Sequence, residues 1–359
     1  MSSSKAQQTP WLQRKLEAIW YQNDSSLLFY LLLPLSALFC FLGKVRRKKS
    51  ESQQEPLPIP IIVVGNISVG GTGKTPLVIK LTELLKNDKD NNYNPAIITR
   101  GYKGTASTWP LHVKPTTKTQ LSGDEAKLMA IRTKVPVIAG ANRVDDIQYV
   151  LANTNCNIII SDDGLQHYRM KRDIEIVVID AQRRFGNGHC LPAGPLRELP
   201  DRLTDCDFVI TNGQPALLDQ NMKTENIMQV SGTELINIST NKKSPLTSFQ
   251  AVQVVTGIGN PQRFINTLEA SGLTLSNSHL FPDHHHFVVE DFDQHSDIPI
   301  VMTEKDAVKC IELGLQNCWY LPVDAKLEQT FETNFLNKVA ESFNQSLGQN
   351  LNQSFDQNT

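Results

Sequence analysis

A ten-residue segment, NISVGGTGKT, constrains the fold of this chain more than any other feature. It runs from Asn66 to Thr75 and follows a short apolar stretch, IPIIVV, at 59–64. Its three glycines allow the backbone to wrap closely and to point successive N–H groups at phosphate oxygens. A helix that begins there adds the positive end of its dipole. The sequence therefore predicts a strand, a phosphate-binding loop and a helix in that order.

The residues of this loop indicate a nucleotide as its ligand. Lys74 is expected to reach the β and γ phosphates, and Thr75 to ligate Mg²⁺. The common pattern is GxxxxGK[ST], and here Ser68 replaces its first glycine, which weakens the match but leaves the mechanism intact. A glycine-rich turn that binds nothing is the alternative. The residues expected to contact the nucleotide are Ser68, Val69, Gly70, Gly71, Thr72, Gly73, Lys74 and Thr75.

Two adjacent carboxylates follow another apolar run, NIII at 157–160. A phosphate loop needs an acidic metal ligand at the end of a neighbouring strand, and Asp162 and Asp163 supply it. Carboxylates at the end of a buried strand are unfavourable unless a cation meets them. An Asp-Asp-Gly turn held by its own hydrogen bonds is the structural alternative. With the phosphate loop, the pair predicts nucleotide hydrolysis or phosphoryl transfer. A guanine-reading NKxD is absent from the sequence, and ITNG at 210–213 resembles it only faintly.

Apolar strand-like runs alternate with helix-like segments over the first two-thirds of the chain. Such alternation is typical of a parallel sheet covered on both faces. We therefore expect an α/β fold, a P-loop NTPase-like, mainly parallel sheet flanked by helices. The expected strands are 59–64, 95–99, 135–139, 157–160, 174–179 and 207–210, and the expected helices are 74–86, 123–132 and 142–151.

A second, smaller α/β run follows a polar, irregular stretch at 212–248. Strand-like runs lie at 251–255, 298–302 and 319–323, and Asn260 with Pro261 predicts a helix start. The Asn-, Gln- and Ser-rich end predicts a frayed, disordered tail. The expected units are an interfacial helix with a membrane anchor at 1–50, a P-loop core at 51–245, a smaller α/β domain at 246–340 and the tail at 341–359.

The amino-terminal region contains LLFYLLLPLSALFCFL, 16 residues from Leu27 to Leu42 without a charge. A spanning helix needs about 20 apolar residues, so this run is marginal, and Pro34 is expected to kink it. Basic residues at 44–49 place the remainder of the chain on the cytoplasmic side. The tryptophans of 11–20 suit a helix in the headgroup layer. A buried core helix is the alternative. A signal peptide is disfavoured, because the run begins late and no small-residue cleavage site comes after it.

Composition excludes other classes of protein. Lys and Arg total 35 and Asp and Glu total 37, a net charge of −2 that argues against a general nucleic-acid binder. The 40% hydrophobic content excludes bulk disorder. Six cysteines without a CxxC pair indicate buried free thiols in a reducing compartment.

Eight ordered segments resemble those of one enzyme family, the bacterial lipid A 4′-kinases (tetraacyldisaccharide 4′-kinases), over residues 10–325. Ser68 is usual in that family, whereas Ala126 replaces a common proline and puts only local geometry in doubt. The segments are VGNISVGGTGKTP, TRGYKG, GDEAKLMA, SDDGLQH, FGNGHCLPAGPLREL, VTGIGNPQRF, FPDHHHF and TEKDAVK.

The resemblance implies an inner-membrane enzyme whose catalytic domains face the cytoplasm. It implies transfer of the γ-phosphate of ATP, with Mg²⁺, to the 4′-hydroxyl of a tetraacylated glucosamine disaccharide 1-phosphate. The active site is expected between the core and the smaller domain. The implied partners are ATP, the acylated disaccharide lipid and inner-membrane lipid. No nucleic acid and no obligate protein partner are expected.

The same resemblance implies the catalytic roles. Asp124 would be the base that activates the acceptor alcohol, paired with His284; on sequence alone it would be read as a helix cap. The His-rich 284–286 run is disfavoured as a zinc site, because consecutive histidines cannot all reach one tetrahedral ion. By the same resemblance Gln166 and His167 are expected close to the phosphates. Arg197 and Arg143 are candidates for binding the substrate's anionic phosphate, because arginine binds phosphate through two hydrogen bonds, and surface arginines without a contact are the alternative. Tyr102 is a candidate for stacking on the nucleotide or for lining the acceptor site.

Two other functions are alternatives to this enzyme activity on sequence evidence. A P-loop ATPase of the metallochaperone or partitioning kind would leave FGNGHCLPAGPLREL at 185–199 without a purpose. A membrane-bound nucleotide-binding module without catalysis is disfavoured, because Lys74, Thr75, Asp162 and Asp163 are all present.

Overall fold

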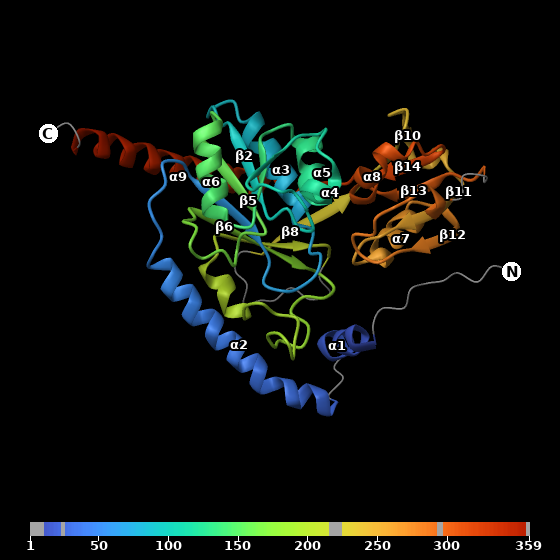
Figure 1. Ribbon diagram of the computed structural model, residues 1–359, viewed down its shortest axis with the longest axis horizontal. Helices are drawn as coiled ribbons and strands as arrows, with labels where there is room; N and C mark the ends of the chain where they lie inside the picture. Colours follow the sequence, from blue (N-terminus) through green and yellow to red (C-terminus); the bar gives the residue numbers. More distant parts are fainter. Residues whose placement is uncertain (1–10, 23–25, 215–224, 293–296, 357–359) are drawn as a thin grey trace.

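The computed structural model describes residues 11–22, 26–214, 225–292 and 297–356. Figure 1 shows a large α/β body, a smaller α/β domain beside it, and two amino-terminal helices along its lower edge. This arrangement confirms the expected fold class.

A nine-stranded sheet forms the body, in the order β15-β8-β7-β6-β1-β5-β2-β4-β3. Neighbouring strands are parallel except at the two edges, where β15 and β3 are antiparallel. The strands are β1 (Ile61–Gly65), β2 (Pro95–Thr99), β3 (Leu111–Val113), β4 (Val137–Ala139), β5 (Ile158–Asp162), β6 (Ile174–Asp180), β7 (Phe208–Asn212), β8 (Glu225–Ser231) and β15 (Asp324–Leu327).

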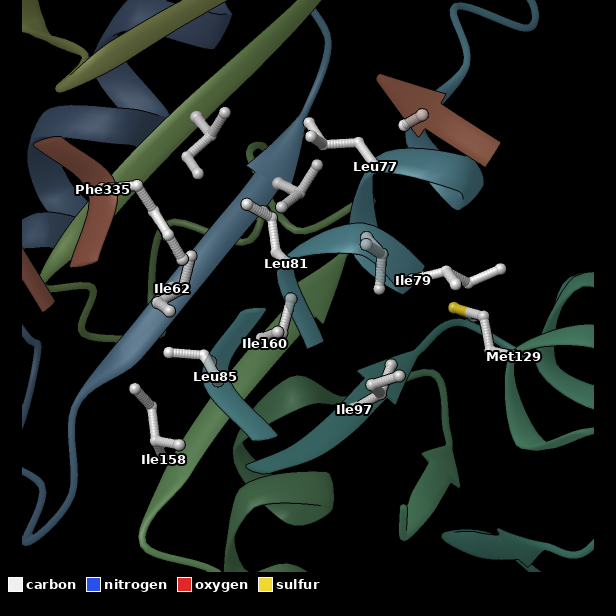
Figure 2. Close-up of a cluster of buried hydrophobic side chains, with 14 of the residues drawn as sticks. Ile62, Leu77, Ile79, Leu81, Leu85, Ile97, Met129, Ile158, Ile160 and Phe335 are labelled. Carbon is white, nitrogen blue, oxygen red and sulfur yellow. The ribbon is translucent and has the colours of Figure 1, made fainter. Parts of the chain in front are cut away.

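Both faces of this sheet are buried, which explains the continuous apolar runs in its strands. On one face Ile62 and Val64 of β1 pack against α3 (Lys74–Asn87), α5 (Asp124–Thr133) and α9 (Gln329–Asp356). Figure 2 shows Leu77, Leu81 and Leu85 of α3 directed at β1 and β5. On the other face Ile61 and Val63 pack against α6 (Arg143–Asn153). Burying one such aliphatic side chain contributes about 1.5–3 kcal/mol.

The second sheet has six strands, in the order β10-β9-β14-β13-β11-β12. Helix α7 (Pro261–Ala270) begins as predicted, because the Asn260 side chain accepts a hydrogen bond from the Arg263 N–H. The strands are β9 (Glu234–Asn237), β10 (Lys243–Pro245), β11 (Ala251–Thr256), β12 (Thr274–Leu280), β13 (Ile300–Thr303) and β14 (Cys318–Leu321). The shorter helices of the chain are α4 (Thr119–Ser122), α8 (Glu304–Cys310), η1 (Pro200–Asp205), η2 (Leu246–Ser248), η3 (Val289–Asp291) and η4 (Ile311–Leu313).

The domain boundaries differ from the expected ones. The chain leaves the first sheet after β8 and enters the second at Glu234, so the boundary lies near 232 rather than 245. It then returns to the first sheet through β15. Helix α9 packs Phe331 and Phe335 against the body, so the smaller domain ends near 323 rather than 340. The smaller domain is thus an insertion between β8 and β15.

The expectation of a frayed tail from Glu341 is wrong for most of its length. Helix α9 continues to Asp356, and Phe343 contacts Tyr93 with ring centroids 5.2 Å apart. Residues 357–359 lie outside the described part of the chain.

Two helices precede the body, α1 (Trp11–Tyr21) and α2 (Leu27–Glu51). Helix α2 is long and apolar enough to cross a membrane. Many of its apolar side chains are exposed, with Leu31 65% and Phe41 64% exposed, which argues against a buried core helix. One side does touch the body, where the Ser36 hydroxyl donates to the Cys190 carbonyl at 2.6 Å.

Helix α1 docks on the body more closely than a helix confined to headgroups would. Ile19 is buried, and the Trp20 indole donates to the Pro192 carbonyl at 3.0 Å. The Trp20 carbonyl accepts from the Asn187 N–H at 2.8 Å. Trp20 therefore faces protein at its polar end. Four of the six cysteines are buried: Cys156, Cys190, Cys310 and Cys318.

Candidate active site

The phosphate loop joins β1 to α3 at the carboxyl edge of the first sheet. Gly73 caps α3 with φ of +93°, and Gly70 has φ of +101°, a backbone region that strongly favours glycine. Two asparagines hold the loop in shape. The Asn66 side-chain amide donates to the Ser68 carbonyl at 2.6 Å, and that of Asn212, which ends β7, donates to the Thr72 carbonyl at 2.9 Å.

The Lys74 ammonium group lies between the loop and the end of β5. It is 3.2 Å from Asp163 Oδ1 and donates to Asn66 Oδ1 at 3.1 Å. Asp163 also lies 3.4 Å from the Arg197 guanidinium. Burial acts to raise the pKa of Asp163, but the charges of Lys74 and Arg197 outweigh it and hold the pKa below its ordinary value. The carboxylate is therefore ionised at neutral pH.

Asp162 occupies the last position of β5 and is buried. One of its oxygens accepts from the Thr99 hydroxyl at 3.1 Å, whereas Oδ1 has no hydrogen-bond partner among the described residues. Burial, with the nearby charge of Glu125, raises the pKa of Asp162 to about 7. A buried carboxylate oxygen without a donor is unfavourable unless a cation approaches it. The donor set of Asp162, Asp163 and Thr75 consists of hard oxygens, which fit Mg²⁺.

Arg143 does not lie where a substrate contact requires it. Its side chain is only 1% exposed, at the start of α6. The guanidinium donates to the carbonyls of Gly140 and Asp162 and to Asp146. The expectation that Arg143 binds the substrate phosphate is therefore wrong. The side chain instead fixes the backbone that carries the acidic pair.

Gln166 and His167 lie on the turn after β5. The Gln166 amide donates to the Asn66 carbonyl at 3.1 Å and accepts from Arg197 at 3.1 Å, so it connects the loop to Arg197. Burial, with the charges of Arg143 and Arg100, lowers the pKa of His167 to about 4. His167 is thus neutral at pH 7 and is not a phosphate cation.

Asp124 and His284 come together from the two domains. Asp124 begins α5 of the body, and its Oδ2 lies 2.8 Å from Nδ1 of His284, which belongs to the smaller domain. Its other oxygen accepts from the Glu125 N–H at 3.0 Å. His284 has φ of +62° and its N–H donates to the Gly257 carbonyl, so the imidazole is held by its own loop.

A cavity of about 250 Å³ gives access to this pair. Tyr102 and Lys127 line it, and the Tyr102 ring lies 5.1 Å from the His284 ring. This position fits the acceptor side rather than nucleotide stacking. The pair is therefore open to a small hydroxyl-bearing group.

Lys305 is a site residue that sequence reasoning did not identify. Its ammonium group lies 4.0 Å from Asp124, 3.1 Å from Glu125 and 3.6 Å from Asp283. Burial acts to raise the pKa of Asp124, but the His284 hydrogen bond and the charge of Lys305 hold it below its ordinary value. Asp124 is therefore an ionised carboxylate near neutral pH.

Replacing Lys305 by glutamine should move the acid side of the kcat–pH profile to higher pH. The reason is that a carboxylate without its neighbouring cation keeps a proton to higher pH. The measurement is kcat across the acidic range with saturating substrates. Lys118→Gln removes an exposed cation from the same cavity and should leave that side of the profile in place. An unshifted profile for Lys305→Gln would contradict this role.

Arg263 was also missed. It lies on α7 of the smaller domain, and its guanidinium donates to Asn212 Oδ1 at 2.7 Å and lies 3.4 Å from Asp180. Since Asn212 holds the Thr72 carbonyl, the smaller domain touches the support of the phosphate loop. Its segment, VTGIGNPQRF, belongs to the sequence resemblance, but nothing in that segment identifies this cross-domain contact.

Comparisons with known proteins point to one family. The family model for tetraacyldisaccharide-1-P 4′-kinase (LpxK) matches residues 28–340. The tetraacyldisaccharide 4′-kinase of Haemophilus influenzae is 45% identical over 315 residues, which cover 86% of this chain and 91% of that protein. The protein of that name from Mannheimia succiniciproducens is 43% identical over 326 residues, covering 90% of this chain and 97% of its own.

A solved structure shares the fold. It is the crystal structure of LpxK from Aquifex aeolicus in complex with ATP, with a TM-score of 0.75 and 28% sequence identity. The match covers 88% of this chain and 100% of that chain. The sequence and structural matches, each over most of the length of both proteins, show that this chain belongs to the tetraacyldisaccharide-1-P 4′-kinase family.

Proposed function

We propose that this protein is a phosphotransferase that moves the γ-phosphate of ATP to the 4′-hydroxyl of a tetraacylated glucosamine disaccharide 1-phosphate, a step in lipid A biosynthesis. The observation that carries the proposal is the Asp124–His284 pair, which lines a cavity formed by residues of both domains. A simple ATPase switch needs no base for an alcohol. Family membership supports the same reaction.

In the proposed step the acceptor hydroxyl attacks the γ-phosphorus. Asp124 takes the hydroxyl proton as the new oxygen–phosphorus bond forms, and the bond from γ-phosphorus to the bridging oxygen breaks to release ADP. His284 orients the carboxylate and shares the transferred proton. The loop N–H groups and Lys74 hold the phosphates in line with the acceptor.

Thr75, Asp162 and Asp163 would hold Mg²⁺, and a bound Mg²⁺ would supply positive charge that offsets the negative charge developing on the phosphate groups. The unpartnered Oδ1 of Asp162 supports this assignment among the described residues. Lys74 and Arg197 both approach Oδ1 of Asp163, at 3.2 and 3.4 Å, and would hold this carboxylate in place. Arg143 donates to the Asp162 carbonyl and keeps the turn in place.

The position of α2 supports a membrane-held acceptor. Its basic end lies along the segment that carries Arg197: Lys44 is 2.9 Å from Asp201, and Arg47 is 3.0 Å from Asp205. A cavity of about 440 Å³ lies between this end and Arg197. We propose that α2 anchors the enzyme in the inner membrane with its catalytic domains on the cytoplasmic side. Arg197 would then meet the anionic phosphate of the lipid.

The direct test is transfer of labelled γ-phosphate from ATP to a tetraacyl disaccharide 1-phosphate by the full-length protein in detergent. A labelled lipid with equimolar ADP is the expected result. Rapid hydrolysis of ATP with no labelled lipid would instead support an ATPase switch.

Membrane attachment should depend on the exposed apolar side of α2. The triple variant Leu31→Glu, Leu38→Glu, Phe41→Glu should no longer bind vesicles of phosphatidylethanolamine and phosphatidylglycerol. The reason is that placing each carboxylate in the hydrocarbon layer costs about 2–3 kcal/mol or more. Flotation measures the bound fraction. Ile311→Glu, at an exposed apolar residue of the smaller domain, is the matched control and should still float. Substitutions are preferable to removing 1–43, because Ile19 is buried against the body. Continued flotation of the triple variant would mean that another surface binds lipid.

A further inference from the structure

Arg183 lies next to the phosphate loop, on the side opposite Asp162 and Asp163. In the first sheet β1 lies between β5 and β6, so the loop after β1 has the β5 carboxylates on one side and the turn after β6 on the other. Arg183 belongs to that turn. Its Nη1 lies 3.1 Å from the position that a Cβ atom on Gly70 would take. A guanidinium group therefore lies directly against a loop glycine.

The backbone of Arg183 is fixed. The buried Asp180, at the end of β6, accepts from the N–H groups of Gln182 and Arg183 at 3.1 and 2.9 Å. The Gly186 N–H in turn donates to the Arg183 carbonyl at 2.9 Å. The side chain thus starts from a rigid turn, as a residue that must meet a ligand in one orientation requires.

Among the residues that the structure describes, the Arg183 guanidinium contacts an aromatic ring and forms no ion pair with a carboxylate. Its central carbon lies 5.6 Å from the centre of the Tyr21 ring, at the end of α1. Within the described ranges, no ion pair includes Arg183, whereas the next residue, Arg184, pairs with Glu225 at 2.8 Å. Asp180 binds the backbone of Arg183 and lies near Arg263. The charge of Arg183 is therefore free to meet an anion at the loop.

Helix α1 is docked firmly enough to hold this arrangement. Asn187, four residues after Arg183, binds the carbonyls of Ile19 and Trp20, and the Trp20 indole binds the Pro192 carbonyl. The segment after Arg183 and the end of α1 therefore form one connected unit. Tyr21 follows Trp20 directly and lies in that unit.

The terminal phosphate of ATP is the anion that suits this position. Lys74 approaches the loop from the β5 side, where Asp163 already shares its charge. The terminal phosphate bears more negative charge than the others and gains charge stabilisation from a planar guanidinium during transfer. Resting on the proposed function, we propose that Arg183 contacts the γ-phosphate of ATP during its transfer to the acceptor hydroxyl. We further propose that the Tyr21 ring positions Arg183 for that contact.

The first experiment compares Arg183→Ala, Arg183→Lys and Arg184→Lys in the full-length protein. A charged hydrogen bond contributes enough to make kcat/KM for ATP fall by about 10- to 100-fold in Arg183→Ala. Arg183→Lys should recover only part of the loss, because an ammonium group cannot bind two oxygens as a guanidinium does. Arg184→Lys keeps its ion pair with Glu225 and should retain wild-type activity. Unchanged kcat/KM in Arg183→Ala would overturn the proposal.

Equilibrium binding separates a phosphate contact from a structural role and needs no lipid acceptor. Arg183→Ala should reduce the preference for ATP over ADP, whereas loss of folding would weaken both nucleotides alike and would overturn the proposal. The wild-type protein separates failure of this proposal from failure of the proposed function. If wild type transfers no phosphate to lipid, the proposed function fails, whatever the nucleotide preference of the variant.

A double-mutant cycle tests the role of Tyr21. A cation–π contact of this kind gives Tyr21→Leu a loss of about two- to fivefold in kcat/KM. The same substitution should add no further loss in the Arg183→Ala background, because the two residues would act through one contact. An equal loss in both backgrounds would show that Tyr21 acts independently of Arg183.

Discussion

Replacing Asp124 by asparagine should lower kcat by about 10²- to 10⁴-fold, the usual contribution of a general base. Asparagine keeps the size of the side chain and can still accept from the Glu125 N–H, but it cannot take a proton. ATP affinity should change little, because Asp124 acts on the acceptor hydroxyl whereas the phosphate loop binds the nucleotide. Steady-state transfer of labelled phosphate and equilibrium binding of ATP give the two measurements.

The neighbouring carboxylate provides the matched control. Glu125 lies next to Asp124, binds the same Lys305 at 3.1 Å and is partly exposed. Glu125→Gln should reduce kcat only a few-fold, through its effect on Lys305. Asp124→Asn with His284→Ala should be no slower than the slower single variant, since the two side chains act as a unit. A turnover number of Asp124→Asn close to wild type would reject the base assignment.

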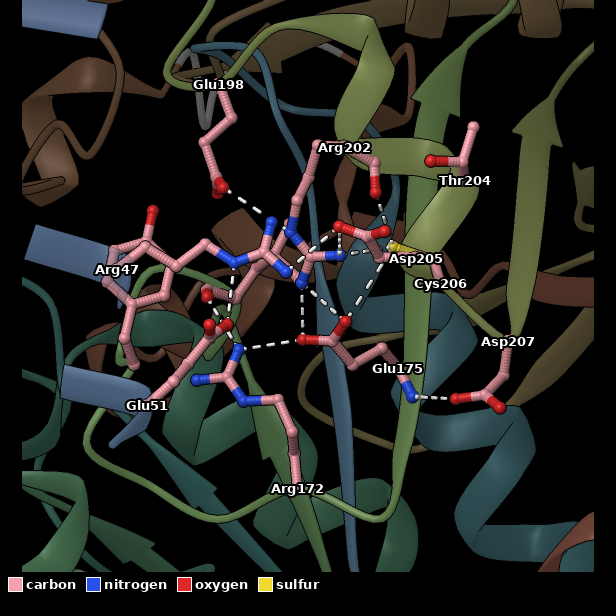
Figure 3. A network of polar contacts seen from close by, with 12 residues as sticks. Arg47, Glu51, Arg172, Glu175, Glu198, Arg202, Thr204, Asp205, Cys206 and Asp207 are labelled. Atoms are coloured by element: carbon pink, nitrogen blue, oxygen red, sulfur yellow. Dashed lines mark hydrogen bonds and ion pairs between the residues drawn. The ribbon is translucent and has the colours of Figure 1, made fainter. Parts of the chain in front are cut away.

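Replacing Glu175 by glutamine should lower the free energy of unfolding by about 3–5 kcal/mol, the usual effect of removing one partner of a buried ion pair. Figure 3 shows Glu175 between the guanidinium groups of Arg172 and Arg202, with Glu198 and Cys206 close by. Arg202 is 3% exposed, so the substitution leaves a buried cation with weaker partners. Thermal or denaturant unfolding measures the change.

Two further variants sharpen this prediction. Adding Arg202→Met to Glu175→Gln should recover stability, because an apolar side chain needs no counter-charge. Lys44→Gln breaks an ion pair in which both side chains are about 60% exposed and should change stability by less than about 1 kcal/mol. If Glu175→Gln and Lys44→Gln have equal effects, the buried network does not stabilise the fold.

The same network gives the stability of the wild type a pH dependence. Burial acts to raise the pKa of Glu175, but Arg202 and Arg172 hold it below its ordinary value of 4.5. A carboxylate whose pKa is lower in the folded state stabilises the fold fully above its ordinary pKa. That contribution is lost as the pH falls through the lowered value. The unfolding midpoint of Glu175→Gln should therefore decline less steeply below about pH 4.5.

The central strands could be predicted because burial on both faces leaves a continuous apolar run. β2 begins and ends at the expected residues, and β1, β5 and β6 lie within two residues of their expected bounds. The edge strands could not be predicted in this way. β12, TLSNSHL, is largely exposed and carries no apolar pattern, so local sequence gives no sign of it. Its partner β11 positions it through backbone hydrogen bonds.

The carboxyl-terminal helix differs from the expected tail because its composition and its periodicity point to different structures. Asn, Gln and Ser dominate after Glu341, yet Phe331, Phe335, Val339 and Phe343 recur at helical spacing and pack on the body. That spacing is visible in the sequence and predicts an amphipathic helix. The return of the chain to the first sheet is not visible there, because it depends on β15 pairing with a strand almost a hundred residues earlier.

The site residues likewise fall into those that local sequence identifies and those that depend on distant contacts. The phosphate loop and the Asp162–Asp163 pair are each contiguous in sequence, so local chemistry identifies them. The 2.8 Å contact between Asp124 and His284 joins residues 160 positions apart, and only the family resemblance pointed to it. Arg143 was misassigned because an arginine at a helix start looks free, whereas its burial depends on the surrounding fold.

The return of the chain through β15 and α9 also sets an order for biosynthesis. Domains fold largely as they leave the ribosome, and the amino-terminal part emerges first. Here α2 is made at the beginning, whereas the last strand of the large sheet and the helix that covers Phe208 are made at the end. The kinase core therefore becomes complete only after the whole smaller domain has been translated. A ribosome that stops near residue 245 would release a chain in which β8 lacks its partner β15 and forms an open sheet edge.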